Sequence, residues 1–215
     1  MEQVAEVLYF PTLRCNLNCR HCGEKQDIPK EQEMDGRLVI RQIAQSTLVR
    51  KQRVISVSGG EPFLNETLPG FILDGMEQTG HSFAITSNGY FYEKIMALVK
   101  NIRDRDKERI RFHISIDGLK ETHNKIRRNP DSFQRAVRTL DSLAQAGIPC
   151  SINTVVQPDN AEELASFREY FTSRHPYAKI NFIPYAPDIG GGIEILMNFI
   201  TKNFRKPYGR IWSIA

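Results

Sequence analysis

The sequence has no apolar run close to the roughly 20 residues that a membrane-spanning helix needs. Its first residues, Met1-Glu2-Gln3, do not form the basic segment followed by an apolar one that is typical of an export signal. We therefore expect no membrane partner and a cytoplasmic location. Dense basic arms are also lacking, because the lysines and arginines behind the net charge of +4 are spread through segments such as 93–111. Nucleic acid is therefore not indicated as a partner.

Cysteine is scarce, with four residues in 215. Three of them lie between Cys15 and Cys22, and the fourth, Cys150, is far away in the chain. This number and spacing exclude a disulfide framework of the kind that stabilises small secreted domains. The distribution instead indicates a reducing compartment and a metal site.

Low-complexity segments and internal repeats are absent, and the length is that of one domain. Short apolar or β-branched runs predict six strands, at 7–13, 54–57, 82–86, 110–116, 148–156 and 179–183. Helical spacing predicts helices between them, at 37–50, 68–79, 92–101, 132–146 and 161–173. This alternation predicts an α/β fold of parallel strands, either as an open doubly wound sheet or as a full or partial barrel.

Polar, turn-forming residues directly follow four of the predicted strands, at 14–23, 58–62, 87–89 and 117–118. Ligand sites of parallel α/β folds form at the carboxyl ends of the strands. We therefore expect these four loops to converge on one rim.

Cys15, Cys19 and Cys22 have the spacing C-x3-C-x2-C in the first of these loops. Thiolates suit zinc or iron and sulfur. A structural zinc site usually closes with four protein ligands, and His21 is too close to Cys22 to chelate without strain. Three cysteines on a four-iron cubane leave one iron open for a small molecule. The alternatives are a zinc loop and a chance grouping of small buried residues.

The cysteine loop resembles that of the radical S-adenosylmethionine (radical SAM) superfamily at every required position. The resemblance covers residues 6 to 185 and implies a partial (βα)6 TIM-like barrel, with a core domain over 1–192 and a C-terminal helix and tail over 193–215. It also implies that the three cysteines hold a [4Fe-4S] cluster and that His21 packs on the adenine of S-adenosyl-L-methionine (SAM).

The segment Ser58-Gly59-Gly60-Glu61-Pro62 resembles the GGEP segment of the same family. By resemblance, it holds the methionyl amino group of SAM. Glycines let the backbone approach a ligand, and the acidic side chain of Glu61 can pair with an ammonium. An ordinary turn with Pro62 at the entry of a helix is the alternative.

The stretch from His113 to Gly118, followed by His123 to Arg127, resembles the S-[LI]-D-G…H-[DN]-x-[IV]-R pattern of the peptide-modifying and sulfatase-maturing branch. By resemblance, Ser115 contacts the ribose of SAM and Arg127 its carboxylate side. A solvated charge at Arg127 is the alternative.

Three further residues are assigned by resemblance to the neighbourhood of the cofactor. Asn88, in the turn Thr86-Ser87-Asn88-Gly89, is expected to reach cofactor or substrate, although Asn-Gly is also common in plain turns. Asn153 and Ile183 fall on strands that contact cofactor or adenine in the family.

The implied activity is that of a radical SAM enzyme: an oxygen-sensitive iron–sulfur protein that reductively cleaves SAM to a 5′-deoxyadenosyl radical, which abstracts hydrogen from a substrate. A peptide or protein substrate is favoured, and the electron donor is of the flavodoxin or ferredoxin type. Cys150 is interpreted as a core residue, so one cluster is expected. The alternatives are a SAM-cluster subunit or activator that docks on a partner protein through 204–212, and a zinc-stabilised binding module.

Overall fold

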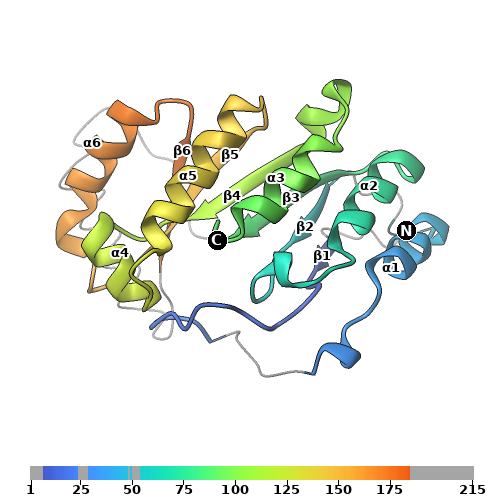
Figure 1. The fold of residues 1–215 in the computed structure, drawn as a ribbon, viewed down its shortest axis with the longest axis horizontal. Helices are drawn as coiled ribbons and strands as arrows, with labels where there is room; N and C mark the ends of the chain where they lie inside the picture. Colours follow the sequence, from blue (N-terminus) through green and yellow to red (C-terminus); the bar gives the residue numbers. More distant parts are fainter. Residues whose placement is uncertain (1–6, 24–28, 48, 50–53, 185–215) are drawn as a thin grey trace, which may run out of the picture.

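The computed structural model describes residues 7–23, 29–47, 49 and 54–184 (Figure 1). The predicted domain boundary at 192 and the predicted helix and tail at 193–215 lie outside the described residues.

Six parallel strands form one sheet in the order in which they occur in the chain. Their bounds are β1 (Val7–Tyr9), β2 (Val54–Val57), β3 (Ser82–Ser87), β4 (Ile110–Ser115), β5 (Cys150–Val156) and β6 (Lys179–Pro184). The order never reverses, so the sheet lacks the switch point that defines an open doubly wound fold. Of the two architectures that the sequence left open, the structure has the barrel type.

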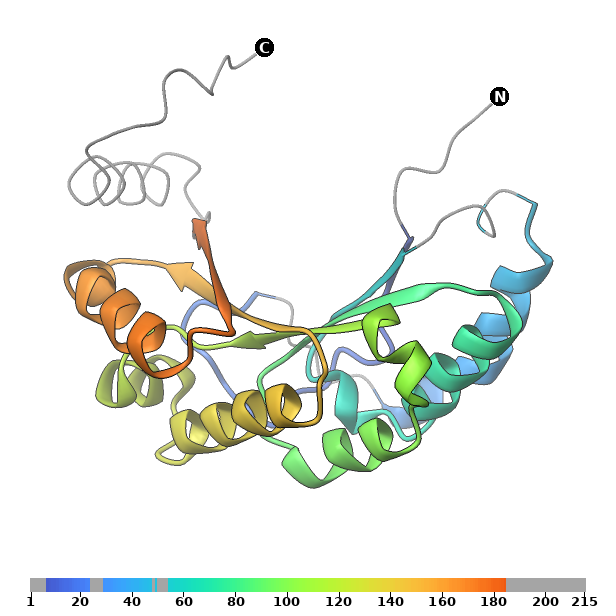
Figure 2. The ribbon, with the colours of Figure 1, turned by 90° about the horizontal axis from the view of Figure 1, so that it is seen from above.

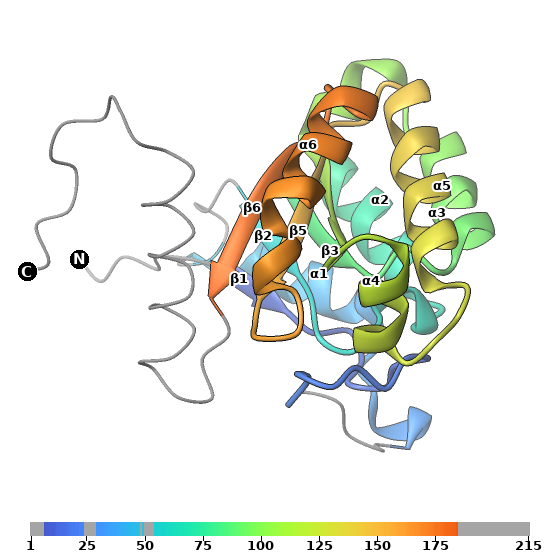
Figure 3. The ribbon, with the colours of Figure 1, turned by 90° about the vertical axis from the view of Figure 1, so that its left-hand side faces the viewer.

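The helices lie on the convex side of the curved sheet, and the other side is concave (Figures 2 and 3). The α-helices are α1 (Gly36–Gln45), α2 (Leu68–Gln78), α3 (Tyr92–Lys100), α4 (Lys120–Arg127), α5 (Ser132–Gln145) and α6 (Leu164–Arg174). Short 3₁₀ helices are η1 (Lys30–Gln32), η3 (Pro62–Leu64), η4 (Asp104–Arg109) and η5 (Ala161–Glu163). None of the helices in the described part of the chain is both long and apolar enough to cross a membrane. The result is a partial (βα)6 barrel, as predicted.

Alternation along the strands separates the core from the site. Residues of one parity, such as Phe83, Phe112 and Ile152, are almost fully buried under the helices. Residues of the other parity face the concave side, because successive side chains of a strand point to opposite faces. The hydrophobic face therefore fixes which side chains are presented inside the barrel.

Several elements differ from the prediction, and the helix predicted at 37–50 ends at Gln45. The strand predicted at 7–13 ends at Tyr9, although Thr12 and Arg14 still accept hydrogen bonds from Gly60 and Glu61 at 2.9 Å. Helix α4 was not predicted, because its sequence KETHNKIR is polar and has one apolar residue, Ile126. It is stabilised by tertiary contacts that apolar periodicity does not reveal.

Candidate active site

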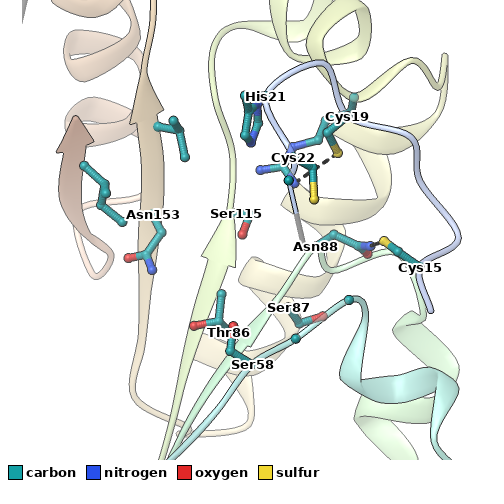
Figure 4. Close-up of a pocket in the computed structure, with 16 residues that line it drawn as sticks. Cys15, Cys19, His21, Cys22, Ser58, Thr86, Ser87, Asn88, Ser115 and Asn153 are labelled. Carbon is teal, nitrogen blue, oxygen red and sulfur yellow. Dashed lines mark hydrogen bonds between the residues drawn. The ribbon is translucent and has the colours of Figure 1, made fainter. Parts of the chain in front are cut away.

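A cavity of about 420 Å³ lies at the carboxyl ends of the strands, facing the loop that carries the three cysteines (Figure 4). We call it the cysteine cavity, and its volume is in the range of pockets for small molecules and cofactors. The residues that line it are Cys15, Cys19, His21, Cys22, Gly23, Ser58, Gly59, Gly60, Thr86, Ser87, Asn88, Ser115, Arg127, Asn153, Val155 and Ile183. The loops after β1, β2 and β3 meet here, as expected from the sequence, whereas after β4 the cavity is lined by Arg127 of α4 and not by the predicted loop at 117–118.

The cysteine loop is anchored to the opposite side of the barrel. The backbone N–H of Arg20 donates to the carbonyl of Ile126 at 3.0 Å, at the end of α4. The Arg20 guanidinium also pairs with Asp159 at 3.2 Å, and Leu17 is 4% exposed. These contacts fix the loop over the strand ends without using a cysteine side chain.

The sulfur atoms of Cys15 and Cys19 have hydrogen-bond donors directed at them. The backbone N–H of Leu17 and the amide of Asn88 approach the Cys15 sulfur at 3.4 and 3.9 Å. The Arg127 guanidinium approaches the Cys19 sulfur at 3.6 Å. Burial raises the pKa of both thiols, and at Cys19 the Arg127 charge opposes this rise. A bound metal centre would be needed to hold both sulfurs as thiolates, and the donors would then stabilise their charge.

All four cysteines are free thiols, and the three of the loop line one cavity. Within the described residues, no three His, Cys, Asp or Glu side chains come together closely enough to hold one metal ion. A cubane takes each cysteine on a different iron, so its ligands stand farther apart than those of a single ion. This arrangement fits a cluster better than a single zinc ion.

Gly59 and Gly60 permit a close approach between two backbone segments. A Cβ on Gly60 would lie 2.0 Å from the carbonyl oxygen of Arg14, and one on Gly59 would lie 2.4 Å from that of Thr12. Gly59 also has a φ of 119°. The sequence suggested that the two glycines let the backbone approach a ligand. In the structure they also let the chain after β2 pack closely against the segment that leads into the cysteine loop.

Glu61 does not point where the sequence suggested. We expected its side chain to pair with an ammonium of the cofactor, but it is fully buried and is not among the residues that line the cavity. Its carboxylate accepts hydrogen bonds from the Ser87 hydroxyl at 2.9 Å and from the backbone N–H groups of Asn88 and Phe63 at 2.8 and 3.2 Å. Burial raises its pKa to about 7. The carboxylate therefore fixes the loops after β2 and β3 to each other, and Pro62, also buried, starts η3 behind the cavity.

Arg127 reaches the cavity while paired with a buried acid. Its guanidinium lies 2.7 Å from the carboxylate of Asp117, which also accepts from the backbone N–H of Val155 at 3.0 Å. His123 accepts from the backbone N–H of Asp117 at 3.0 Å, and burial lowers its pKa to about 3. Within the described residues, Arg127 Nε is buried without a hydrogen-bond partner. The alternative of a solvated Arg127 is wrong, since the side chain is 9% exposed.

The other predicted residues all line the cysteine cavity. Ser115 ends β4, and Asn153 lies beside it on β5 in the strand register. His21 faces the Gln157 amide at 3.2 Å, and Asn88 donates to the Asn16 side chain at 2.9 Å. Ile183 is 41% exposed on β6. Their roles toward a cofactor stay predictions.

Sequence reasoning named the segments that contain Gly23 and Thr86, but it missed Val155, which also lines the cavity. Val155 faces the cavity from β5, two residues from Asn153 on the same strand. Period-two counting from Asn153 would have found it.

Residues 9–171 match the family model described as the Radical SAM superfamily, which is more than half of the 215 residues. The chain belongs to the radical SAM superfamily. Members of this superfamily use a [4Fe-4S] cluster and SAM, and those are the cofactors of the chain. The buried unpartnered Arg127 Nε and the donors on two cysteine sulfurs fit these groups.

The proteins to which the chain is similar are named for different activities. The chain is 29% identical over 162 residues to an Fe-coproporphyrin III synthase of Methanosarcina barkeri, covering 74% of the chain and 38% of the relative. It is 29% identical over 182 residues to a GTP 3′,8-cyclase of Sulfurovum sp., covering 81% and 52%. The structure of anSMEcpe with bound AdoMet and Kp18Cys peptide has the same fold, with a TM-score of 0.63, 20% identity and coverage of 83% and 50%. The chain thus spans between 38% and 52% of the length of these radical SAM relatives.

Proposed function

We propose that this chain is a radical SAM enzyme that cleaves SAM reductively at a [4Fe-4S] cluster held by Cys15, Cys19 and Cys22. The observation that carries the proposal is the set of three free thiols lining a cavity at the strand ends. When bound, the cluster and SAM supply a 5′-deoxyadenosyl radical that abstracts a hydrogen atom from the substrate.

The residues around the cavity have separable tasks in this proposal. Asn88, Arg127 and the Leu17 N–H stabilise charge on the cysteine sulfurs. The unpartnered Nε of Arg127 supplies a donor for the carboxylate of SAM, because guanidinium suits carboxylates. The backbone of Gly59 and Gly60, rather than the buried side chain of Glu61, faces the cavity and takes the methionyl end.

Ser115 and Asn153 present a hydroxyl and an amide on neighbouring strands. These groups suit the hydroxyls of a ribose. His21 and Ile183 supply apolar surface for the adenine from the loop and from β6. The task of the barrel and loops toward the bound cofactor and substrate is to keep water away, because a reactive carbon radical would otherwise be quenched.

The substrate is proposed as a class. A peptide or protein is favoured by the Ser115-to-Arg127 motif, and the anSMEcpe structure of the same fold holds a peptide. The named sequence relatives point to small molecules, a tetrapyrrole or GTP. The electron donor is proposed to be a flavodoxin or ferredoxin. A role as a SAM-cluster subunit stays an alternative, and its docking segment at 204–212 lies outside the described residues.

The test is anaerobic reconstitution of the cluster, reduction with dithionite and measurement of 5′-deoxyadenosine. Cys19→Ala is expected to lose both the brown colour, measured as absorption at about 400 nm, and the formation of 5′-deoxyadenosine. Cys150→Ala is the matched control, because Cys150 lies outside the cavity beside the carbonyl of Leu140. Retention of a normal cluster in Cys19→Ala would refute the ligand assignment, and stoichiometric zinc in a colourless protein would support the zinc module.

A further inference from the structure

A second cavity opens on the same concave face, toward the amino ends of β4, β5 and β6. Its volume is about 400 Å³, close to that of the cysteine cavity. We call it the amino-end cavity, and its lining residues are Arg111, His113, Pro149, Cys150, Ser151, Tyr177, Lys179 and Asn181. None of these residues has a task in the proposed cleavage of SAM.

The two cavities are lined by different residues on the inward-facing side of the same three strands, β4, β5 and β6. On β4, Arg111 and His113 line the amino-end cavity and Ser115 the cysteine cavity. On β6, Lys179 lines the first and Ile183 the second. Arg111 and Ser115 are four residues apart, as are Lys179 and Ile183, which is about 13 Å at the rise of a parallel strand.

The border between the cavities is a pair of side-chain amides. Asn181 donates to the Asn153 carbonyl oxygen at 3.0 Å and approaches the Ser151 hydroxyl at 3.3 Å. Asn153 lines the cysteine cavity, beside Ser115 in Figure 4. Side-chain amides can turn or exchange partners without moving the backbone. A molecule of modest length can therefore extend along the concave face from one cavity into the other.

The amino-end cavity carries positive charge without a counter-charge. Within the described residues, neither Arg111 nor Lys179 forms an ion pair or a side-chain hydrogen bond. Arg127, by contrast, is paired with Asp117. The carboxylate of Asp141, which lies near Cys150, is bonded to Tyr177 and to His175. Two unpaired cations facing one hollow form an electrostatic site for an anion.

Neutral donors accompany these cations. Lys179 lies beside Ser151, and Ser151 beside His113, in the register of the sheet. The His113 Nδ1 and the Ser151 hydroxyl are 2.6 Å apart. Burial, together with the Arg111 charge, lowers the pKa of His113, so its ring is neutral near pH 7 and acts by hydrogen bonding.

We propose that the amino-end cavity binds an anionic group of the substrate, a carboxylate or a phosphate, with Arg111 and Lys179 as the cations that hold it. The inference rests on the proposed function and adds a class of substrate to it. The substrate extends from the cysteine cavity to its anion at Arg111 and Lys179, which lie about 13 Å along the strands from Ser115 and Ile183. Arg111 and Lys179 are specificity-determining residues, remote from the reacting atoms.

The test is equilibrium dialysis of inorganic phosphate and of succinate against the cluster-loaded, SAM-saturated protein. SAM saturation keeps either anion from the open iron. Saturable binding of one probe is expected, and the preferred probe tells phosphate from carboxylate. Arg111→Gln combined with Lys179→Gln is expected to weaken this binding by about tenfold or more, and Arg111→Lys is expected to retain most of it.

Lys100→Gln with Arg41→Gln is the control, because both residues are exposed on helices of the convex side. Circular dichroism checks that each variant is folded. Absence of saturable binding, or equal binding by the double variant and the parent, overturns the subsite. Release of 5′-deoxyadenosine, measured on the same preparations, tests the proposed function separately. If the parent protein binds the anion but releases no 5′-deoxyadenosine, the proposed function is refuted and the anion subsite stands.

Discussion

Two carboxylates that lie behind the cysteine cavity have opposite surroundings. Glu61 and Asp117 are both fully buried, and each lies in a loop directly after a strand. Glu61 accepts three hydrogen bonds from uncharged donors and, within the described residues, has no ion-pair partner. Asp117 faces the guanidinium of Arg127 at 2.7 Å. The half of the barrel with β1 to β3 is thus joined by a carboxylate without a cation, and the half with β4 to β6 by an ion pair.

This difference determines which perturbation is expected to destabilise each half. Burial without a cation raises the pKa of Glu61 to about 7, so this side of the site responds to pH. Asp117 has a cation beside it, so removal of that cation is expected to destabilise its side. We call the Glu61 hydrogen bonds and the Asp117–Arg127 ion pair the two joints. Both joints position the chain around the same three thiols, and either can be removed by mutation without changing a cysteine.

Removing Arg127 is expected to have the largest effect on stability. Arg127→Met leaves the Asp117 carboxylate buried without its counter-charge, which costs about 3–5 kcal/mol of unfolding free energy. Lys125→Met on the same helix breaks an ion pair with Asp159 whose lysine is 64% exposed, and it is expected to cost less than about 1 kcal/mol. Urea unfolding of both variants measures the contrast. Equal losses would mean that the buried pair contributes no more than a surface one.

A change of pH is expected to act on the Glu61 side. The pKa of Glu61 is about 7 in the folded protein, above the ordinary value of 4.5, so folding favours the protonated form. Its contribution to stability is complete below 4.5 and is lost as the pH rises through 7. Relative to Glu61→Gln, the wild type should therefore lose about 3 kcal/mol between the two ends of this range.

The comparison with Glu61→Gln also removes the opposite effect of His123. Burial lowers the pKa of His123 to about 3, so wild type and variant alike lose stability as the pH falls below 6.5. Taking the difference between their unfolding free energies at each pH cancels this shared loss. A difference that stays flat between pH 5 and 8 would show that Glu61 is ionised throughout.

The sequence predicted the sheet well and the joints poorly, for a physical reason. Strand and helix positions depend on local apolar periodicity, which Phe83, Phe112 and their neighbours display. The direction of the Glu61 side chain depends on donors 26 and 27 residues farther along the chain. The polar helix α4 depends on burial of His123 and Arg127 rather than on an apolar stripe. The motif residues could be named, but the sequence did not show that Glu61 and Pro62 lie behind the cavity and not in its lining.

Gly60→Ala is expected to disturb the Glu61 side through its backbone. The new Cβ would lie 2.0 Å from the Arg14 carbonyl oxygen, so the chain before Cys15 must move. Overpacking of this kind costs about 1–3 kcal/mol, and we expect the content of reconstituted iron to fall as well. Gly70→Ala is the control, because its Cβ would meet the flexible end of Arg37, at 2.6 Å. Parallel unfolding and iron analysis of both variants would decide, and normal iron in Gly60→Ala would contradict the coupling.

Ser115→Ala is expected to have the smallest effect on stability, because this hydroxyl belongs to neither joint. Ser115 is half-buried at the end of β4 and lines the cavity between the two halves. We expect the unfolding free energy to change by no more than about 0.5 kcal/mol. Loss of a hydrogen bond to the ribose should weaken SAM binding by about two- to tenfold, since one such bond contributes about 0.5–1.5 kcal/mol. Anaerobic calorimetric titration with SAM measures this, with Ser142→Ala on α5 as the matched control. Equal SAM affinities of the two variants would remove Ser115 from the contacts of the cofactor and leave both joints intact, since neither depends on this hydroxyl.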